Sequence, residues 1–270
     1  MVRSATSPGS TTGQPRRPLT GRPVPPASKA SPFLLDRDTG HPPTETISDN
    51  GTMTLRAVIF DMDGTLTDSE EWWDELRRGL AAEEGIAWPV GATDAMMGMS
   101  TREWSAYMTT VVGVSGTPEQ VAEYTIAGML ARYRAGVPLL PGADAAVRMA
   151  AGRWKTGICS SSPQALIESV ASETGWIELL GAIVSTELVA AGKPAPDGYL
   201  RVAELLKVDP AGCVVIEDSA NGVTSALAAG MKVVEVLPRF NPPSGELLAR
   251  CDLVVDSLEM ITPKMLALLY

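Results

Sequence analysis

The chain contains six short apolar runs, and segments with helical spacing separate most of them. They lie at residues 55–60, 155–159, 182–184, 213–216, 233–237 and 253–255. An apolar run without alternation predicts a strand buried on both faces. Helices between such strands predict parallel pairing, with helices covering both faces of the sheet. We therefore expect an α/β fold built on a parallel sheet.

A long helical stretch interrupts this pattern between the first and second runs. Residues 67–136 contain segments with helical spacing after Ser69, at about 100–112 and at about 117–134. Ser69 is followed by two glutamates, which is typical of a helix N-cap and first turn. The stretch is too long for a loop. We predict an all-helical domain at 67–136, inserted into a core formed by 53–66 and 137–270.

The N-terminal segment has a different composition. Residues 1–52 contain nine prolines and almost no periodic apolar pattern, so they cannot bury enough surface to offset the entropy of ordering. We predict that this extension is disordered, and we also consider that translation starts at Met53. The single histidine, His41, lies in this segment. Histidine-based catalysis and most zinc sites are therefore excluded from the folded part.

Charge and composition limit the classes of partner that we expect for this protein. The formal net charge of −10 argues against a nucleic-acid partner, because phosphate backbones recruit basic surfaces. No apolar run is long enough for a membrane helix, and the N-terminus lacks the apolar core of a secretory signal, so we expect a cytoplasmic protein without a membrane partner. Cys159, Cys213 and Cys251 are widely spaced beside apolar runs and are expected to be reduced core residues. The sequence does not indicate the oligomeric state.

Acids, hydroxyls and one lysine follow the predicted strands at their carboxyl ends, where open parallel sheets bind ligands. In chain order they are Asp61 and Asp63, then Ser160, Ser161 and Ser162, then Lys193, and finally Glu217 and Asp218.

This set suits phosphoryl transfer with a hard metal ion. Asp61, Asp63 and Asp218 supply the oxygen ligands that Mg2+ prefers. Asp61 is placed to attack phosphorus, and Asp63 to protonate the leaving oxygen and later deprotonate water. Ser160 and Lys193 would bind the phosphoryl oxygens.

Each of these features alone also has an ordinary structural explanation. An Asp-x-Asp pair is common in turns, and lysines and serines are common on surfaces and in loops. Glu217 and Asp218 also fit the start of a helix. Ser162 followed by Pro163 is typical of a helix cap, which would direct a helix N-terminus at the same anion. The functional interpretation depends on their joint occurrence at successive strand ends.

The ordered motifs resemble those of the haloacid dehalogenase-like superfamily. They are Asp61-Met62-Asp63-Gly64-Thr65, the serine after Ile158-Cys159, Gly192-Lys193-Pro194 and the segment 217–222. The helical insertion resembles the cap of the phosphoglucomutase-like branch. This resemblance implies a Rossmann-like core, dependence on Mg2+, and a nucleophile and acid/base at Asp61 and Asp63. It further implies phosphate binding by Ser160, with Ser161 beside it, and by Lys193, and metal binding by Asp218 with help from Glu217.

Departures from related subfamilies favour a phosphatase. Dehalogenases of this superfamily lack the second aspartate, which is present here as Asp63, and phosphonate-cleaving relatives need a cap lysine, which residues 67–136 lack. Where the mutase of this branch has a cap histidine, this chain has Trp73, and Arg102 follows Gly98-Met99-Ser100 one residue later than in the mutase pattern. We expect a phosphatase that acts on a small-molecule phosphate ester, a sugar phosphate or a related compound. The alternatives are a sugar-phosphate mutase and a catalytically silent phospho-ligand binding protein.

Four cap residues are candidates for substrate contact: Ser69, Trp73, Arg102 and Trp104. The tryptophans have a second interpretation as ordinary packing inside a helix bundle. Arg102 is placed to reach a second anionic group, although a solvated arginine near a helix start needs no ligand. Residues 70–136 contain five arginines and ten acids. A highly anionic substrate would be repelled unless an arginine points inward.

Overall fold

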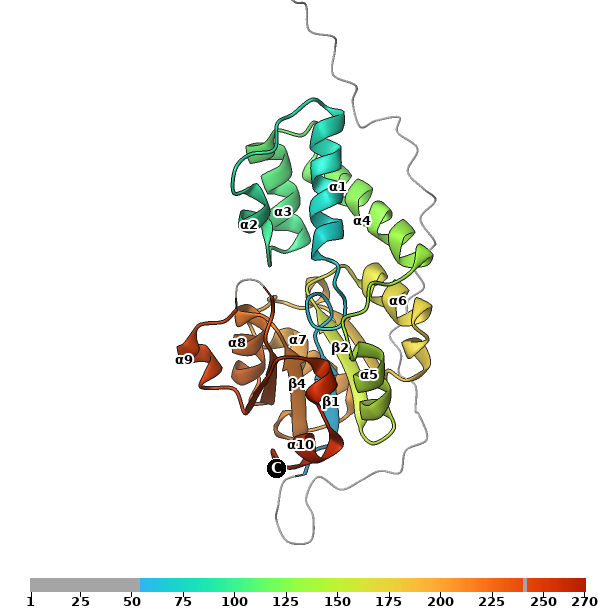
Figure 1. Cartoon of the computed structure of the whole chain (residues 1–270), viewed down its shortest axis with the longest axis vertical. Helices are drawn as coiled ribbons and strands as arrows, with labels where there is room; N and C mark the ends of the chain where they lie inside the picture. The colour runs from blue at the N-terminus through green and yellow to red at the C-terminus, as the bar shows by residue number, and fades with distance from the viewer. Residues whose placement is uncertain (1–53, 240–241) are drawn as a thin grey trace, which may run out of the picture.

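A six-stranded parallel sheet forms the base of the computed structural model, which describes residues 54–239 and 242–270. The strand order is β3-β2-β1-β4-β5-β6 (Figure 1). The strands are β1 (Ala57–Phe60), β2 (Lys155–Ser160), β3 (Ala182–Ser185), β4 (Cys213–Glu217), β5 (Lys232–Val236) and β6 (Leu253–Val255). This confirms the predicted fold class, with strand ends that differ from the prediction by at most two residues. The predictions for residues 1–52, His41 and Met53 lie outside the described residues.

Both faces of the sheet are buried over most of β1 to β5, which explains why these strands do not alternate in polarity, whereas the edge strand β6 is partly exposed. Val58 and Phe60 of β1 pack in one apolar cluster, and Ala57 and Ile59 pack in another on the opposite face. Helices α5 (Ala143–Ala151), α6 (Gln164–Glu173) and α10 (Pro263–Ala267) cover the first face, and α7 (Asp197–Leu206) and α8 (Ala220–Ala228) cover the second. The remaining short elements are α9 (Gly245–Leu248) and 3-10 turns at Trp176–Glu178, Thr186–Leu188, Pro210–Gly212 and Leu258–Met260.

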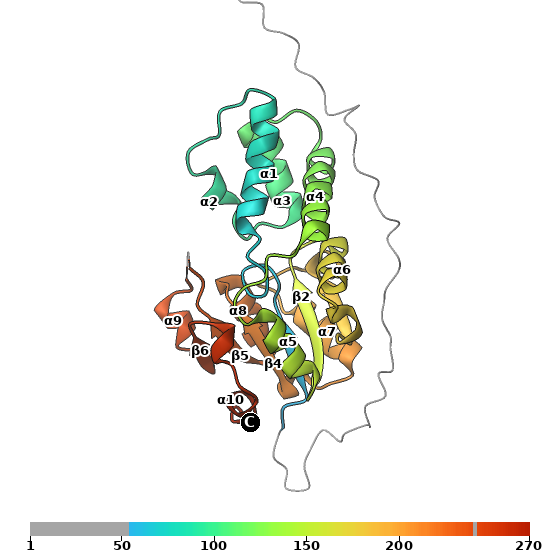
Figure 2. The ribbon, with the colours of Figure 1, turned by 45° about the vertical axis from the view of Figure 1, so that its right-hand side comes forward.

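Four helices form a separate bundle beyond the carboxyl ends of the strands (Figures 1 and 2). They are α1 (Glu70–Glu83), α2 (Ala92–Met96), α3 (Thr101–Tyr107) and α4 (Pro118–Ala135), with a π-helical turn at Met108–Val112 after α3. The chain leaves and re-enters the sheet through two adjacent linkers. The backbone N–H of Asp68 donates to the carbonyl of Pro138 over 2.7 Å, and that of Leu140 to Leu66 over 3.0 Å. The chain thus connects the bundle to the sheet through one pair of linkers, and α4 also packs against α6 of the core.

Several local predictions about helices need correction. The helix expected at about 100–112 is divided at Tyr107 by the π-helical turn, and α2 was not predicted. Ser69 occupies the N-cap position of α1, but its side chain makes no capping hydrogen bond. Helix α6 begins at Gln164 with Pro163 at its N-cap, so Ser162 is not the cap. Both hydroxyls bond elsewhere, as described below. Within residues 54–239 and 242–270, no helix combines the length and apolar character needed to cross a bilayer.

Candidate active site

Three carboxylates from two adjacent strands meet where the sheet faces the helical bundle. Asp61 follows β1, Glu217 is the last residue of β4, and Asp218 comes directly after it. Asp61 and Asp218 are 7% and 8% exposed, and Glu217 is fully buried. One oxygen from each lies within 4.8 Å of the others. Parallel pairing of β1 with β4 produces this arrangement, because it places the ends of the two strands side by side.

Lys193 brings a positive charge to this cluster from the loop between β3 and α7. Its ammonium donates to Asp61 Oδ1 over 2.5 Å, to Glu217 Oε1 over 2.6 Å and to the Cys159 carbonyl over 3.1 Å. The lysine side chain is only 5% exposed. Burial opposes its charge, but Asp61 and Glu217 raise the Lys193 pKa well above its usual value. The lysine is therefore a fixed cation whose three donors are all used.

Glu217 is held by hydrogen bonds to both of its oxygens. Oε1 accepts from Lys193 and, over 2.8 Å, from the Tyr199 hydroxyl. Oε2 accepts from the backbone N–H groups of Asp218 and Ser219 and from the Ser219 hydroxyl, at 2.9 to 3.0 Å. Burial alone would raise the Glu217 pKa, but Lys193 and these donors lower it. Glu217 is thus an ionised residue that fixes the position of Lys193.

Asp218 is fixed by the turn that follows β1. The Thr65 hydroxyl, which is fully buried, donates to Asp218 Oδ1 over 2.7 Å. Gly64 has a φ of +89°, and a Cβ at this position would lie 2.3 Å from Asp218 Oδ2. A side chain at residue 64 would displace the carboxylate as well as strain the backbone. The Asp-Gly-Thr sequence after β1 therefore positions an acid that lies about 150 residues further along the chain.

The charge balance of this cluster fits a bound divalent cation. Burial raises the pKa of Asp61 and of Asp218 well above the usual value, and Lys193 opposes this only in part. One lysine therefore faces three buried carboxylates. Ionised carboxylates in such a setting need a further cation. Carboxylate oxygens are hard donors of the kind that suit Mg2+. Asp61 and Asp218 keep oxygens available for it.

Asp63 lies in a different environment, bonded to three serines. Its Oδ1 accepts from the Ser69 hydroxyl over 2.6 Å. Its Oδ2 accepts from Ser162 over 2.7 Å and from Ser160 over 3.3 Å. Asp63 is not part of the group of carboxylates that converge within 4.8 Å. The two aspartates of the first motif thus lie in separate surroundings: Asp61 beside one lysine and two further carboxylates, and Asp63 among neutral hydroxyls.

The haloacid dehalogenase-like hydrolase family profile matches residues 55–230, which include every residue of this cluster. The chain belongs to this family. The resemblance seen in the sequence is confirmed, and the protein is a hydrolase enzyme of the haloacid dehalogenase-like type.

Curated relatives of this hydrolase include two phosphatases. It is 33% identical over 205 residues to the bifunctional riboflavin kinase/FMN phosphatase of Arabidopsis thaliana, covering 74% of this chain and 53% of that protein. The chain thus spans about half the length of this relative. It is 33% identical over 225 residues to hexitol phosphatase A of Escherichia coli K12, covering 78% and 94%. Among solved structures, beta-phosphoglucomutase from Clostridium difficile shares the fold, with a TM-score of 0.67, 24% identity and coverage of 80% and 97%.

The other residues expected in this hydrolase from the sequence lie outside the group of three carboxylates. Ser161 is half-buried and forms no hydrogen bond with another described residue. Trp73 and Trp104 are 9% and 2% exposed, with ring centroids 5.8 Å apart. Arg102 is exposed and lines a cavity of about 420 Å³ with Glu187 of the core. The structure brings the two tryptophans together and leaves Arg102 on the surface of the bundle.

Several residues that support the site were not predicted for these roles. Tyr199 contacts Glu217 and Thr65 contacts Asp218 across long sequence separations. Ser162 was interpreted as a helix cap and instead donates to Asp63. Tyr133, at the end of α4, is fully buried, and burial together with the nearby Asp63 carboxylate raises its pKa. Only Thr65 had a sequence signal, through its place in the Asp-x-Asp-Gly-Thr motif.

Proposed function

We propose that this hydrolase is a Mg2+-dependent phosphatase that acts on a small-molecule phosphomonoester, a sugar phosphate or a related compound, through an aspartyl-phosphate intermediate. The observation that carries the proposal is the difference between the surroundings of Asp61 and those of Asp63. Asp61 is buried beside Lys193 and the carboxylates of β4, whereas Asp63 is held by serines. Covalent carboxylate catalysis needs a nucleophile of the first kind and an acid/base of the second.

Asp61 is the proposed nucleophile. Lys193 occupies Oδ1, and Oδ2 accepts no hydrogen bond from the described part of the chain. Attack of this oxygen on phosphorus forms a P–O bond as the ester P–O bond breaks. Protonated Asp63 gives its proton to the leaving oxygen. Asp63 then takes a proton from water, which attacks the same phosphorus and releases inorganic phosphate and free Asp61.

Phosphate binding is assigned to Lys193, Ser160 and Ser161. Lys193 has the charge to neutralise phosphoryl oxygens as transfer proceeds. Ser160 lies at the end of β2, where its hydroxyl now donates to Asp63, and Ser161 follows it without a protein partner among the described residues. Transfer of the Ser160 hydroxyl from Asp63 to a phosphoryl oxygen would link substrate binding to release of the acid.

Metal binding is assigned to Asp61 and Asp218, with Glu217 and Asp63 in supporting positions. Mg2+, when bound, neutralises charge on the phosphoryl group. The two oxygens of Glu217 are already bonded to five donors, so Glu217 acts through Lys193. Asp63 orients its carboxylate toward the serines instead of toward this group.

The bundle of α1 to α4 is proposed to be a cap that selects the substrate and excludes water. In this proposal the cap is residues 67–136, and the core is 53–66 with 137–270. Support comes from its position over the strand ends and from the single pair of linkers through which the chain connects it to the sheet (Figure 2). The partner is a small phosphate ester, as the names of the curated phosphatases suggest by analogy. The cytoplasmic location stays a prediction.

Phosphate release from a panel of sugar and polyol phosphates, with and without Mg2+, tests the proposal. We expect release that requires Mg2+ and is abolished in Asp61→Asn, with circular dichroism showing an intact fold. Near-normal turnover by Asp61→Asn would contradict the nucleophile assignment. Interconversion of hexose phosphates without phosphate release would identify the alternative, a mutase like the enzyme whose fold this chain shares. Tight binding without either reaction would identify a silent binding protein.

A further inference from the structure

Three arginines of the helical bundle lie against tryptophan rings. The guanidinium of Arg132 lies 5.6 Å from the centroid of Trp72, and that of Arg78 lies 5.1 Å from Trp88. Arg77 lies against two rings, at 5.2 Å from Trp73 and 4.7 Å from Trp104. Stacking of this kind stabilises a guanidinium but leaves its N–H donors in need of acceptors.

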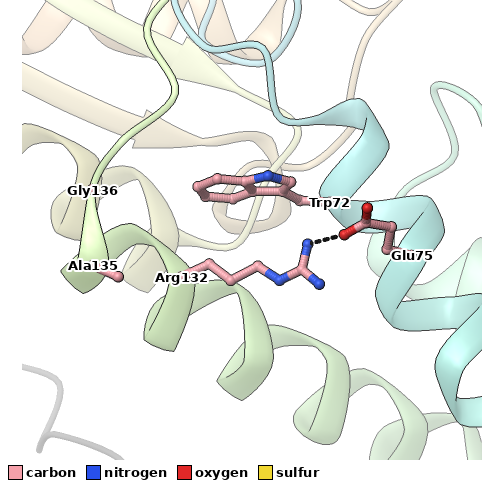
Figure 3. A pocket seen from close by; sticks show the side chains of 5 residues that line it. All are labelled: Trp72, Glu75, Arg132, Ala135 and Gly136. Carbon is pink, nitrogen blue, oxygen red and sulfur yellow. Dashed lines mark hydrogen bonds and ion pairs between the residues drawn. The ribbon is translucent and has the colours of Figure 1, made fainter.

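Two of these arginines have such acceptors within the bundle. Arg132 Nη1 donates to Glu75 over 2.6 Å beside the Trp72 ring, as Figure 3 shows. Arg78 donates to Asp74 over 2.5 Å and to the Thr93 hydroxyl over 2.9 Å. Their donors are used inside the protein. These contacts show that Arg132 and Arg78 stabilise the packing of the bundle.

Arg77 differs, because it has no hydrogen bond or ion pair with any residue in the described ranges 54–239 and 242–270. Its Nε is buried and has no partner. Asp74 is the acid whose charge acts on Arg77, but its carboxylate is already bonded to Arg78 and Thr93. Burial lowers the Arg77 pKa to about 10, so the group is still charged at neutral pH. A charged group of this kind lacks the anion that would offset its burial.

The two rings stacked on Arg77 carry N–H donors and no oxygen acceptor. The indole N–H groups of Trp73 and Trp104 form no hydrogen bond with another residue of 54–239 and 242–270, and the two rings pack against each other and against Arg77. The cluster formed by Arg77, Trp73 and Trp104 is therefore cationic and aromatic within a bundle that is acidic overall. A ligand rich in oxygen acceptors matches it.

The position of the cluster relates it to the catalytic residues. Ser69, Trp73 and Arg77 are spaced by four residues and share one side of α1, and the first of them bonds to Asp63. Trp104 lies in the first turn of α3, and Thr101 of the same turn lines a cavity together with Glu187 of the core. Figure 1 shows the first turns of α1 and α3 at the end of the bundle nearest the sheet. Trp73 and Trp104 thus lie in the turns of the bundle nearest the sheet, and Arg77 lies one turn further along α1.

We propose that Arg77, flanked by Trp73 and Trp104, binds an anionic oxygen group at the end of the substrate remote from the reacting phosphate. The group is a carboxylate or a second phosphate. This inference rests on the proposed phosphatase function and narrows its substrate class to phosphate esters with a second anionic group. Specificity follows from the acidic remainder of the bundle, which repels anions elsewhere.

Matched ester pairs test the assignment and distinguish the two anions. The carboxylate pair is 3-phosphoglycerate with glycerol 3-phosphate, and the phosphate pair is fructose 1,6-bisphosphate with fructose 1-phosphate. The measurement is the ratio of kcat/KM for the ester with the second anionic group to that for its partner without it. In Arg77→Met we expect this ratio to fall by about 10- to 100-fold for one pair, the loss typical of a hydrogen bond to a charged group. Arg77→Lys should lose less, and Arg132→Met, which removes another stacked arginine of the bundle and leaves Asp74 bonded to Arg78, should keep the wild-type ratio.

Binding provides a readout that does not depend on turnover. Calorimetric titration of the same esters into Asp61→Asn and into Asp61→Asn with Arg77→Met should show the same loss of preference. Arg77→Met could weaken the binding of esters with and without the second anionic group equally, or the wild-type enzyme could show no preference for the second group. Either result would overturn the inference while leaving the phosphatase function in place. Failure of the proposed function would instead appear as no Mg2+-dependent release from para-nitrophenyl phosphate. If Arg77→Met does not fold, the same ratio in Arg77→Lys decides.

Discussion

The burial of Glu235 predicts that the stability of the protein depends on pH in a specific way. This residue of β5 is fully buried, and neither of its oxygens has a hydrogen-bond partner in the described part of the chain. It pairs in register with Glu217 of β4, so both side chains lie on the same face of the sheet. Burial, and then repulsion by Glu217, raises the Glu235 pKa from its ordinary value of 4.5 to about 8. Burial of this kind favours the protonated, neutral form of Glu235 in the folded protein.

The sign and size of the effect follow from this shift. A carboxyl group with a higher pKa in the folded than in the unfolded chain favours folding at low pH. That contribution is fully present below about pH 4.5 and is lost as the pH rises to about 8. A difference of about 3.5 units, at about 1.4 kcal/mol each, corresponds to about 5 kcal/mol in the free energy of unfolding. Neutral Glu235→Gln removes this dependence.

Urea unfolding followed by tryptophan fluorescence measures the effect. The experiment is run with a chelator, from about pH 5 to 8.5, on wild type and Glu235→Gln. We expect the variant to become more stable relative to wild type by up to about 1.4 kcal/mol per pH unit. The other groups that interact with Glu235 are Glu217, Asp218 and Cys251, and they are present in both proteins. Glu246→Gln, a substitution at an exposed glutamate of α9, is the control.

Two results would refute this reasoning. A difference between variant and wild type that does not change with pH would show that Glu235 keeps the same protonation in the folded and unfolded chain. A difference that falls as the pH rises would show an ionised Glu235 stabilised by a cation or donor. The exposed control should give a flat difference, which separates burial from substitution itself.

Three further substitutions give distinct expected outcomes. Lys193→Met leaves two buried carboxylates without their lysine, so urea unfolding should show a loss of about 3–5 kcal/mol together with loss of turnover. Gly222→Ala places a Cβ 1.6 Å from Glu217 Oε1, so the melting temperature should fall although alanine favours helices by about 1 kcal/mol; an unchanged or higher melting temperature would contradict the geometry. Ser162→Ala removes a donor to Asp63, and steady-state kinetics should show kcat reduced by about tenfold with little change in KM; an effect confined to KM would contradict a role in positioning the acid.

The sheet and its acidic edge could be predicted because the information is local. Residues 213–216 form an apolar run, and Glu217 follows it directly. Parallel pairing then places the ends of such runs side by side whatever the intervening sequence. The same logic assigned Asp61 and Lys193 to one edge, where their ion pair is now seen. Strand ends moved by one or two residues because the pairing continues until a partner strand ends.

The side-chain partners could not be predicted, because they depend on residues far apart in the chain. Ser69 and Ser162 have the sequence context of helix caps, and each hydroxyl is bonded to Asp63 instead. A buried carboxylate competes strongly for such donors, and a local pattern does not contain it. Tyr199 has no motif of its own, and Glu235 is one polar residue within an apolar strand. Their importance follows only from the burial that the tertiary structure imposes.

The segment 217–222 shows how a short sequence can serve a single carboxylate. Ser219 caps α8 by accepting from the Gly222 N–H, and the same hydroxyl donates to Glu217 Oε2. Gly222 leaves the space in which that carboxylate lies. Glu217 in turn fixes the ammonium of Lys193 against Asp61. The helix start, the glycine and the acid therefore act as one unit, which holds the lysine in place before substrate arrives, as electrostatic preorganisation requires.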